Sequence, residues 1–439
     1  MFSYSKKKIV IIGIGITGLS CLDFFLRKNI VPYMIDTRQT LPIDIYKKIP
    51  KFIKMHLGSF KKEWILTADL IIVSPGVNIK NSMFLEAMKN GVEIISDIEL
   101  FCRETNLPII AITGSNGKST VTTLIGKMIK DSGYIVGIGG NIGFPVLNLL
   151  AIKKIQIYVL ELSSFQLENT YNLKTQSSSI LNITSDHLDR YPLGIKDYRA
   201  AKLQIYNDAQ NIVVNADDIM TFPINNLHTD FVKFGEKNQQ YCLNETKEWI
   251  RIDNNNILNV NDLKIIGYHN YINALAALAL SETINLPRHY CINTLKNFYG
   301  LPHRFQLILE KNNIKWINDS KSTNIGSVQA ALKSINCENV LWLLLGGDGK
   351  SANFSILKKD LLAKKIRIYS FGRDRKIFES IFSDITICKE TLKEAVIEIA
   401  KQVKKGDVVL LSPGCASTDQ FDNFAHRGNI FTQLAKEFS

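Results

Sequence analysis

The sequence predicts an α/β protein of three domains, each built around a mostly parallel sheet. The chain has 439 residues, which at about 100 to 200 residues per domain corresponds to roughly three domains. Strand-sized apolar runs alternate with helical stretches along the chain, which is typical of parallel sheets. The composition, 46% hydrophobic and 21% charged, excludes a disordered, collagenous or membrane-embedded chain.

The first predicted domain, residues 1–97, is Rossmann-like. We expect strands at 8–12 and 70–73, a third strand that ends at Asp36, and a helix at 19–28. Gly13-Ile14-Gly15-Ile16-Thr17-Gly18 satisfies G-x-G-x-x-G after the first strand, and Asp36 follows about 20 residues later. This arrangement predicts a site for a nucleotide diphosphate, because backbone N–H groups and a helix amino terminus converge there.

The second predicted domain, residues 98–301, has a parallel sheet of the P-loop ATPase type. Its elements are expected at 108–113 (strand), 119–132 (helix), 155–161, 178–184 and 211–215 (strands), and 274–283 (helix). Residues 231–266 alternate polar and apolar side chains between Asn-rich turns, which predicts a peripheral antiparallel meander. The third domain, residues 302–439, is Rossmann-like α/β, with strands expected at 315–318, 340–345, 366–371 and 408–411.

A phosphate-binding loop is predicted where the strand at 108–113 meets its helix. The residues are Gly114-Ser115-Asn116-Gly117-Lys118-Ser119-Thr120, a narrower variant of G-x-x-x-x-G-K-[ST]. Lys118 is expected to reach the β- and γ-phosphates, and a hydroxyl of Ser119 or Thr120 to meet Mg²⁺. The pattern therefore indicates ATP binding.

The remaining features narrow the class of protein. The net charge of +12 is dispersed along the sequence. It contains no compact basic segment interleaved with aromatic residues, so nucleic-acid binding is not predicted. Seven cysteines without a C-x-x-C pair indicate neither a disulfide framework nor a zinc site. The apolar stretch at 9–22 contains three glycines and lacks a cleavage site, so we expect a cytoplasmic protein with no membrane span. We also expect a monomer.

Motifs in all three segments resemble those of the Mur ligases, the ATP-dependent amide ligases that build the peptidoglycan stem peptide. The shared motifs are residues 113–120, 139–143, 161–167, 182–189, 301–304 and 318–321. Residues 191–192, 198–202, 346–350 and 411–421 most resemble the members that join D-glutamate to UDP-N-acetylmuramoyl-L-alanine through an acyl phosphate. The resemblance implies that the first domain binds the UDP-substrate, the second ATP and Mg²⁺, and the third the amino acid.

The resemblance also implies the roles of individual residues. The catalytic residues would be Lys118, Glu161, His187, Lys202, Arg304 and Lys321. ATP would be bound by Gly114, Ser115, Asn116, Gly117, Lys118, Ser119, Thr120, Asn270, Asn273, Arg304 and Asp319. The UDP-substrate would be bound by Gly15, Ile16, Thr17, Asp36, Thr37, Arg38, Ser74, Gly76, Asn141 and His187. D-Glutamate would be bound by Lys350, Ser417 and Phe424. The metal ligands would be Ser119, Glu161, His187 and, if CO₂ carbamylates it to N6-carboxylysine, Lys202.

Other interpretations of the same residues stay open at this point. Taken alone, His187 is better explained as a structural histidine, Asn270 equally suits helix capping, and Phe424 suits a core position. The rival enzyme is a Mur-type ligase for another amino acid, or a folylpolyglutamate synthetase. From other classes come an NAD(P)-binding oxidoreductase, which would use residues 13–18 and Asp36, and a noncatalytic nucleotide sensor.

Overall fold

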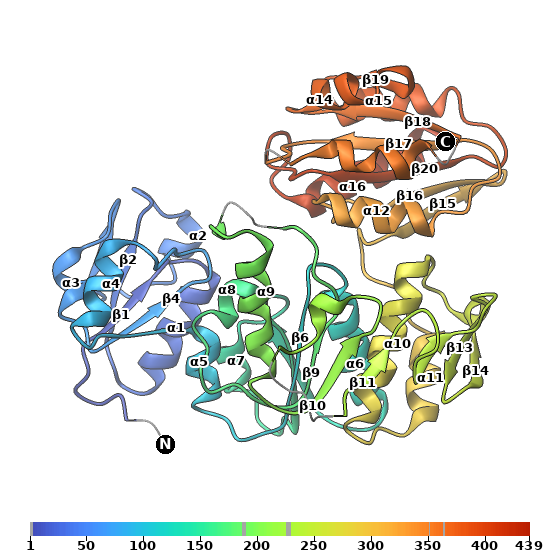
Figure 1. Ribbon diagram of the computed structural model, residues 1–439. Coiled ribbons are helices and arrows are strands. Elements are labelled where there is room, and N and C mark those ends of the chain that lie inside the picture. The colour runs from blue at the N-terminus through green and yellow to red at the C-terminus, as the bar shows by residue number, and fades with distance from the viewer. Residues whose placement is uncertain (1–2, 187–189, 225–229, 351, 363–364) are drawn as a thin grey trace. The chain divides into compact units, whose positions relative to one another are not determined.

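The computed structural model describes residues 3–186, 190–224, 230–350, 352–362 and 365–439 (Figure 1). The chain forms two compact units. The first unit contains residues 1–183, 187–241 and 276–294, and the second contains residues 184–186, 242–275 and 295–439. Three sheets run through these units, and each has helices packed against it (Figure 1).

The N-terminal sheet is parallel, with the strand order β3-β2-β1-β4-β5. Its strands are β1 Ile9–Ile12, β2 Tyr33–Asp36, β3 Met55–Leu57, β4 Leu70–Val73 and β5 Glu93–Ser96. Its helices are α1 Ile16–Arg27, α2 Ile43–Tyr46, α3 Lys62–Leu66, α4 Ser82–Lys89 and α5 Asp97–Cys102. Alternate residues of β1 enter separate apolar cores, one containing Ile9 and Ile11 and the other Val10 and Ile12, so both faces are covered. The order reverses between β1 and β4, which is where such sheets bind ligands.

The middle sheet has the order β14-β13-β12-β11-β10-β9-β6-β8-β7. Its strands are β6 Ile109–Thr113, β7 Val136–Gly140, β8 Ile157–Glu161, β9 Lys174–Ile180, β10 Asp208–Asn215, β11 Val232–Phe234, β12 Tyr241–Leu243, β13 Trp249–Ile252 and β14 Asn255–Asn259. Its helices are α6 Lys118–Asp131, α7 Val146–Leu149, α8 Ser164–Leu167, α9 Ile195–Leu203, α10 Tyr268–Glu282 and α11 Arg288–Lys296, with 3₁₀ turns at Gln204–Tyr206, Ile219–Thr221 and Val260–Asp262.

Two sequence predictions for this sheet are wrong in part. The strand expected at 178–184 is β9, which ends at Ile180. Ser177, Ser178 and Ser179 are fully buried in it between β6 and β10, and such polar residues give no hydrophobic signal. The region 231–266 is not an antiparallel meander throughout, because β11 pairs in parallel with β10 and β12 in parallel with β11. Only the β13–β14 hairpin is antiparallel there, among the pairings described.

The C-terminal sheet has the order β15-β16-β20-β17-β18-β19, and only its β15–β16 pairing is antiparallel among those described. Its strands are β15 Gln306–Lys311, β16 Ile314–Asn318, β17 Leu341–Gly346, β18 Ile366–Phe371, β19 Thr386–Cys388 and β20 Val408–Gly414. Its helices are α12 Ile325–Ser334, α13 Lys358–Leu362, α14 Arg375–Ile381, α15 Leu392–Ala400 and α16 Phe424–Phe438, with 3₁₀ turns at Phe354–Leu357 and Ser383–Ile385. The predicted α/β class and the four strands expected in this domain are confirmed.

A buried polar seam joins the N-terminal sheet to the middle sheet within the first unit. The Glu99 carboxylate is fully buried and accepts hydrogen bonds from the backbone N–H groups of Tyr171 and Asn172, at 2.7 and 2.8 Å, and from Arg103 Nε at 2.8 Å. Burial alone would raise the pKa of Glu99, but the hydrogen bonds from Asn172 and Arg103 outweigh it and lower the pKa. These hydrogen bonds join the segments that follow β5 and α8 within the first unit.

Candidate active site

The phosphate loop is shaped by two glycines between β6 and α6. Gly114 has φ +150° and Gly117 φ +85°, and a Cβ on Gly114 would lie 3.1 Å from Leu181 Cβ. Gly117 is the residue before α6, and no side chain caps the amino terminus of this helix. The loop thus has the geometry that the sequence predicts for binding phosphate oxygens.

Asn182 holds this loop from the chain that follows β9, a contact that the sequence pattern did not assign. Its backbone carbonyl accepts from Ser115 N at 2.9 Å, its Oδ1 accepts from Asn116 N at 2.8 Å, and its Nδ2 donates to Asn116 O at 3.0 Å. The asparagine therefore fixes the loop backbone before any ligand binds. Asn182 belongs to one of the quoted motifs, but nothing in the spacing pointed to the loop.

Lys118 begins α6 and folds back over the loop. Its Nζ donates to Gly114 O at 2.7 Å and Ser115 O at 2.9 Å. Both acceptors are neutral carbonyls, so phosphate oxygens can replace them at a gain in charge–charge energy. The position suits the phosphate contact expected of this lysine.

Glu161 ends β8, the strand beside β6, and is 1% exposed. Its Oε1 accepts from Asn141 Nδ2 at 2.7 Å, whereas its Oε2 is buried and has no hydrogen-bond partner among the described residues. An unsatisfied buried carboxylate oxygen is costly. A hard cation would satisfy it, because Mg²⁺ prefers oxygen ligands.

The residues near Glu161 therefore fit a magnesium ion. Ser119 is the second residue of α6 and is buried, as the expected hydroxyl ligand would be. No group of three or more His, Cys, Asp or Glu side chains is placed to hold a metal ion in the part of the chain that the structure describes. His187, expected as a ligand for metal and substrate, lies outside the described residues.

Lys202 is a buried lysine on α9, 1% exposed, that reaches the same loop. Its Nζ donates to Thr113 Oγ1 at 3.0 Å and to Gly114 O at 3.1 Å, and it lies 4.7 Å from the centre of the Tyr198 ring. The Tyr198 hydroxyl lies 3.2 Å from Ser115 Oγ. Helix α9 is thereby tied to the carboxyl end of β6, where the reaction is expected.

The N-terminal nucleotide site lies at the carboxyl ends of β1 and β4. Gly13 has φ +94°, and a Cβ there would lie 2.7 Å from Ser74 Oγ, so only glycine allows this approach. Ser74 Oγ donates to Gly13 O at 3.0 Å. Helix α1 starts after Gly15 without a side-chain cap, and Ile16 is 72% exposed at its start. Free N–H groups and an exposed apolar side chain suit a diphosphate and a flat base.

Asp36 and Arg38 form the wall of this site. The Asp36 carboxylate accepts from Ile14 N at 2.7 Å and from Arg38 at its Nε, 2.9 Å, and its NH2, 2.8 Å. Burial alone would raise the pKa of Asp36, but the hydrogen bonds from Arg38 and Ile14 outweigh it and lower the pKa. A dinucleotide-binding acid must be free to accept from ribose hydroxyls, and here four donors, counting the Arg38 N–H, already occupy it.

Asn141, expected to bind the UDP-substrate, contacts Glu161 as described above. Thr37 and Gly76 lie at the carboxyl ends of β2 and β4, as does Thr17 in the first turn of α1. Thr17, Thr37 and Gly76 thus follow strands of the N-terminal sheet at the same edge, whereas Asn141 follows β7 of the middle sheet.

In the second unit, the loops before β15 and after β16 carry the expected third-domain charges. Asp319 is half-buried, and its carboxylate accepts from Ser412 Oγ at 3.0 Å and Phe305 N at 3.1 Å. Burial raises the pKa of Asp319 to about 7, against the lowering effect of these hydrogen bonds. Arg304 is half-buried between His303 and Phe305, which both have positive φ, +63° and +48°. The strained loop presents the arginine at a fixed place.

Lys321 and Phe424 lie together. Lys321 Nζ is 4.2 Å from the centre of the Phe424 ring, a cation–π distance. Phe424 is half-buried and is the first residue of α16, so its N–H is not used within the helix. It is therefore not a core residue, and its N–H lies at the amino terminus of a helix.

Arg427 organises the loops around this pair, and the sequence pattern missed it. Its side chain is fully buried and donates to Ser320 O at 2.8 Å, Cys415 O at 3.1 Å and Gly346 O at 3.5 Å. These carbonyls lie at the carboxyl ends of β16, β20 and β17. Burial lowers the pKa of Arg427 to about 10. The one sequence feature that could have indicated its role is the position of this arginine, one turn after the start of an amphipathic helix.

The other expected contacts for the amino acid and ATP lie within the second unit as well. Lys350 is exposed, with φ +48°, on the loop after β17, and Ser417 is buried after β20. Asn270 and Asn273 are buried at the start of α10, where Asn270 Nδ2 donates to Ile266 O at 2.8 Å. Because α10 begins at Tyr268, Asn270 is not its N-cap, and the helix-capping interpretation is wrong.

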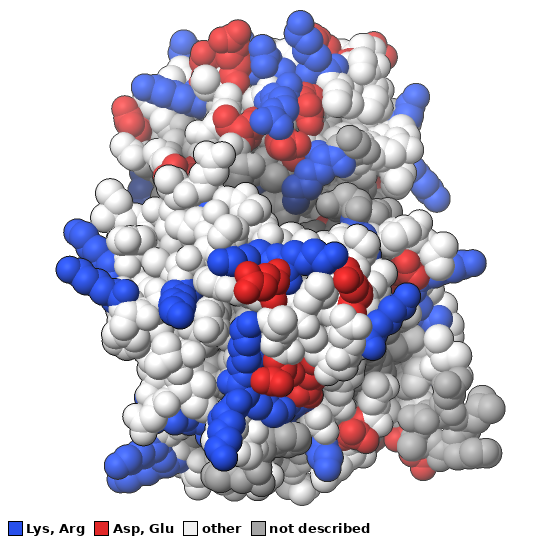
Figure 2. Space-filling view, turned by 90° about the vertical axis from the view of Figure 1, so that its left-hand side faces the viewer, with Lys and Arg blue, Asp and Glu red and all other residues white. Residues whose placement is uncertain are grey.

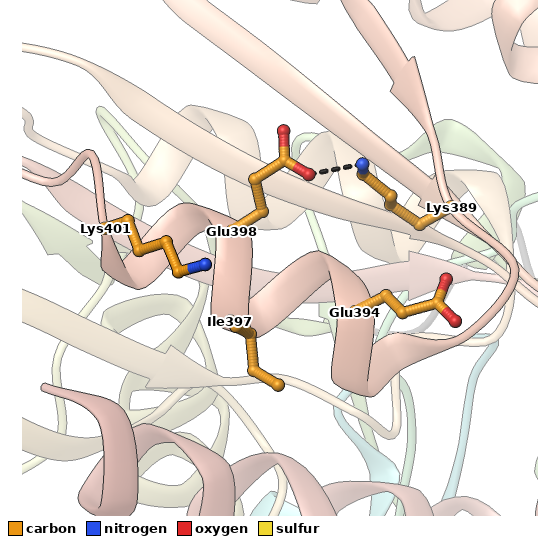
Figure 3. A pocket seen from close by; sticks show the side chains of 5 residues that line it. All are labelled: Lys389, Glu394, Ile397, Glu398 and Lys401. Carbon is orange, nitrogen blue, oxygen red and sulfur yellow. Dashed lines mark ion pairs between the residues drawn. The ribbon is translucent and has the colours of Figure 1, made fainter.

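A cavity of about 400 Å³ lies elsewhere, beside α15 (Figure 3). It is lined by Lys389, Glu394, Ile397, Glu398 and Lys401, and Lys389 forms an ion pair with Glu398. None of its lining residues is among those assigned above to ATP, the UDP-substrate or D-glutamate. It plays no part in the site.

Similarity to known proteins covers the whole chain. Residues 7–96 match the Mur ligase MurD-like N-terminal domain, residues 112–281 the Mur ligase middle domain, and residues 303–415 the Mur ligase glutamate ligase domain. The UDP-N-acetylmuramoylalanine–D-glutamate ligases of Salmonella paratyphi A and Escherichia coli are each 51% identical over 440 residues, covering 100% of both chains. The MurF ligase of Thermotoga maritima in complex with ADP has a TM-score of 0.64 at 17% identity, covering 100% of this chain and 98% of that one.

The fold and the loop site define an ATP-dependent ligase, and this chain belongs to the Mur ligase family. Relatives that match it along their full length are D-glutamate ligases by name. No helix in the described part of the chain has the length and apolar character needed to cross a bilayer.

Proposed function

We propose that this chain joins D-glutamate to UDP-N-acetylmuramoyl-L-alanine, with ATP converted to ADP and phosphate, in the synthesis of peptidoglycan precursors. The observation that carries the proposal is the 51% identity, over the full length, to ligases named for these two substrates. The loop, acid and lysine described above supply the chemistry that such a ligation needs.

The first step would make a leaving group. A carboxylate oxygen of the L-alanyl group attacks the γ-phosphorus, the bond to the β-phosphate oxygen breaks, and ADP leaves. Two anions must approach one another, so cationic and N–H groups are needed. Lys118 and the amino terminus of α6 would hold the phosphates. Mg²⁺, when bound at Glu161 and Ser119, would neutralise further phosphate charge.

The second step would use the third-domain residues. The D-glutamate amine attacks the acyl carbon, the C–O bond to phosphate breaks, and the amine loses a proton. Lys350, Ser417 and the Phe424 N–H would hold the carboxylates of D-glutamate. Arg304 and Lys321 would balance charge on the leaving phosphate, and Asn270, Asn273 and Asp319 would contact ATP.

Lys202 would act in its carbamylated form. Reaction of its neutral amine with CO₂ gives N6-carboxylysine and a proton, which turns a cation into a carboxylate-like ligand. In the unmodified form its Nζ donates to two oxygens, and the carbamate N–H would keep one of these bonds. The burial of Lys202 beside the loop favours loss of its charge. His187 would complete the ligands.

Asp36→Asn is expected to raise KM for the UDP-substrate by about 10- to 100-fold, because the amide cannot hold both Ile14 N–H and Arg38 in the site wall. KM for ATP should change less than about twofold, since the phosphate loop is separate. Steady-state kinetics with each substrate varied measures both. Asp69→Asn is the control, because Asp69 accepts from Lys8 N at the opposite edge of the same sheet. An equal effect of both variants would contradict the assignment.

Lys350→Met is expected to raise KM for D-glutamate by about 10- to 100-fold, the value of a lost charged hydrogen bond. KM values for ATP and the UDP-substrate should stay near those of the parent. Lys358→Met, an exposed lysine in the same domain, is the matched control. Unchanged KM for D-glutamate would remove Lys350 from the acceptor site.

Location and assembly follow from the same proposal. The nucleotide substrates are made and used where ATP is available, so we place the enzyme in the cytoplasm. We propose further that it acts as a monomer, with all the assigned residues supplied by one chain.

The deciding experiment is phosphate release from ATP with each reactant left out in turn. Release should require both UDP-N-acetylmuramoyl-L-alanine and D-glutamate. Turnover with L-lysine or meso-diaminopimelate in place of D-glutamate would indicate a ligase for another amino acid. A change in NADH absorbance would indicate an oxidoreductase, which the occupied Asp36 carboxylate disfavours.

A further inference from the structure

Residues 43–54, here called the lysine ramp, follow the N-terminal nucleotide site as a run of helical turns. Helix α2 is continued by backbone hydrogen bonds from Lys48 N to Ile45 O and from Ile53 N to Pro50 O. Ile49 and Ile53 are buried in the N-terminal core, and Ile45 packs against it. These inward side chains fix the ramp on the domain.

The outward side of the ramp carries apolar side chains. Ile43, Tyr46 and Phe52 are 73%, 57% and 62% exposed. Among the described residues, no other stretch of ten carries three exposed large apolar side chains. Exposing so much apolar area together indicates an interaction surface rather than a folding requirement.

The charge around these side chains is strongly positive. Lys47, Lys48, Lys51 and Lys54 are exposed, and the first three form no ion pair with any described residue. Residues 43–62 hold six lysines and one acidic residue, Asp44. Figure 2 shows one face of the molecule, over which Lys and Arg side chains are scattered between acidic ones. The proposed nucleotide sites leave this part of the net charge of +12 unused.

We propose that the lysine ramp docks on the surface of an anionic lipid bilayer. Ile43, Tyr46 and Phe52 would enter the boundary between headgroups and acyl chains, while the lysines meet lipid phosphates. Separate apolar side chains that stand out between lysines fit a headgroup layer better than a protein partner, which requires a continuous packed face. Docking would be peripheral and reversible, and it is independent of the reaction proposed above.

Sedimentation with lipid vesicles tests the proposal on the full chain. The protein should sediment with vesicles of equal parts phosphatidylglycerol and phosphatidylcholine and not with phosphatidylcholine alone, and high salt should release it. The variant Lys47→Gln/Lys48→Gln/Lys51→Gln should bind about 100-fold more weakly. Ile43→Ser/Tyr46→Ser/Phe52→Ser should bind at least about tenfold more weakly. All these side chains are exposed, so phosphate release in solution should not change.

The matched control is Lys401→Gln/Lys404→Gln/Lys405→Gln. It removes three exposed lysines within five residues of the C-terminal domain, where no large apolar side chain is exposed nearby. Its vesicle binding should equal that of the parent. The proposal fails if the parent does not sediment with anionic vesicles, if the control loses as much as the ramp variants, or if the apolar variant binds normally. Binding to polyglutamate but not to vesicles would indicate an acidic protein partner instead.

Discussion

Glu161→Gln is expected to lower kcat/KM by about 1000-fold, the largest effect of any single conservative change in the site. The amide has the shape of the carboxylate and can still accept from Asn141 Nδ2. It lacks the negative charge that a cation needs, and its NH₂ would replace the oxygen that has no partner among the described residues. The loss should therefore come from metal binding, not from misfolding.

Two measurements separate these causes. The Mg²⁺ concentration that gives half-maximal activity should rise sharply in Glu161→Gln, while the melting temperature should not fall. Glu168→Gln is the control, because Glu168 lies just after α8 and pairs with Lys80 and Arg190 instead of facing the loop. If Glu161→Gln kept the parent's Mg²⁺ dependence, the metal assignment would be wrong.

Lys202→Ala is expected to abolish measurable ligation, a loss of about 1000-fold or more, and added bicarbonate should not restore it. The substitution removes a buried side chain that bonds Thr113 Oγ1 and Gly114 O. It also removes the amine on which a carbamate would form. Full activity of this variant would contradict the proposed role of Lys202 in the ligation.

Lys202→Arg distinguishes the carbamate from a simple cation. Arginine keeps the positive charge but does not form a carbamate, so it should be as inactive as alanine if the modification matters. An active arginine variant would show that the ammonium itself is sufficient. Carbon-13 bicarbonate should give a carbamate signal in the parent that both variants lack. Melting temperatures of all three proteins check that the fold survives.

Regular elements with strong apolar patterns were predictable from the sequence. The strands around Ile11, Ile72 and Ile110 and the glycine loops after them agree with the structure, because buried parallel strands are continuous apolar runs. Strand β9 was placed four residues late at its start, since its buried residues are serines. Local pattern carries no information on such small buried polar residues.

Within the site, residues with a phosphate-loop pattern were predictable from physical chemistry. Residues that act through long-range contacts were not. Asn182 reaches the loop from 66 positions away in the sequence, and Arg427 ties the ends of three strands that are distant along the chain. Lys202 and His187 were assigned by resemblance alone, because a lysine on a helix gives no local signal of a ligand.

The fate of oxygen in the substrate carboxylate tests the proposed ligation most directly. UDP-N-acetylmuramoyl-L-alanine labelled with oxygen-18 in its carboxylate is incubated with ATP and D-glutamate, and the phosphate is analysed by mass. One labelled oxygen should appear in each phosphate released, because the oxygen that attacks the γ-phosphorus leaves with it when the amide forms. Unlabelled phosphate, or release that does not need D-glutamate, would contradict an acyl-phosphate ligase of this specificity.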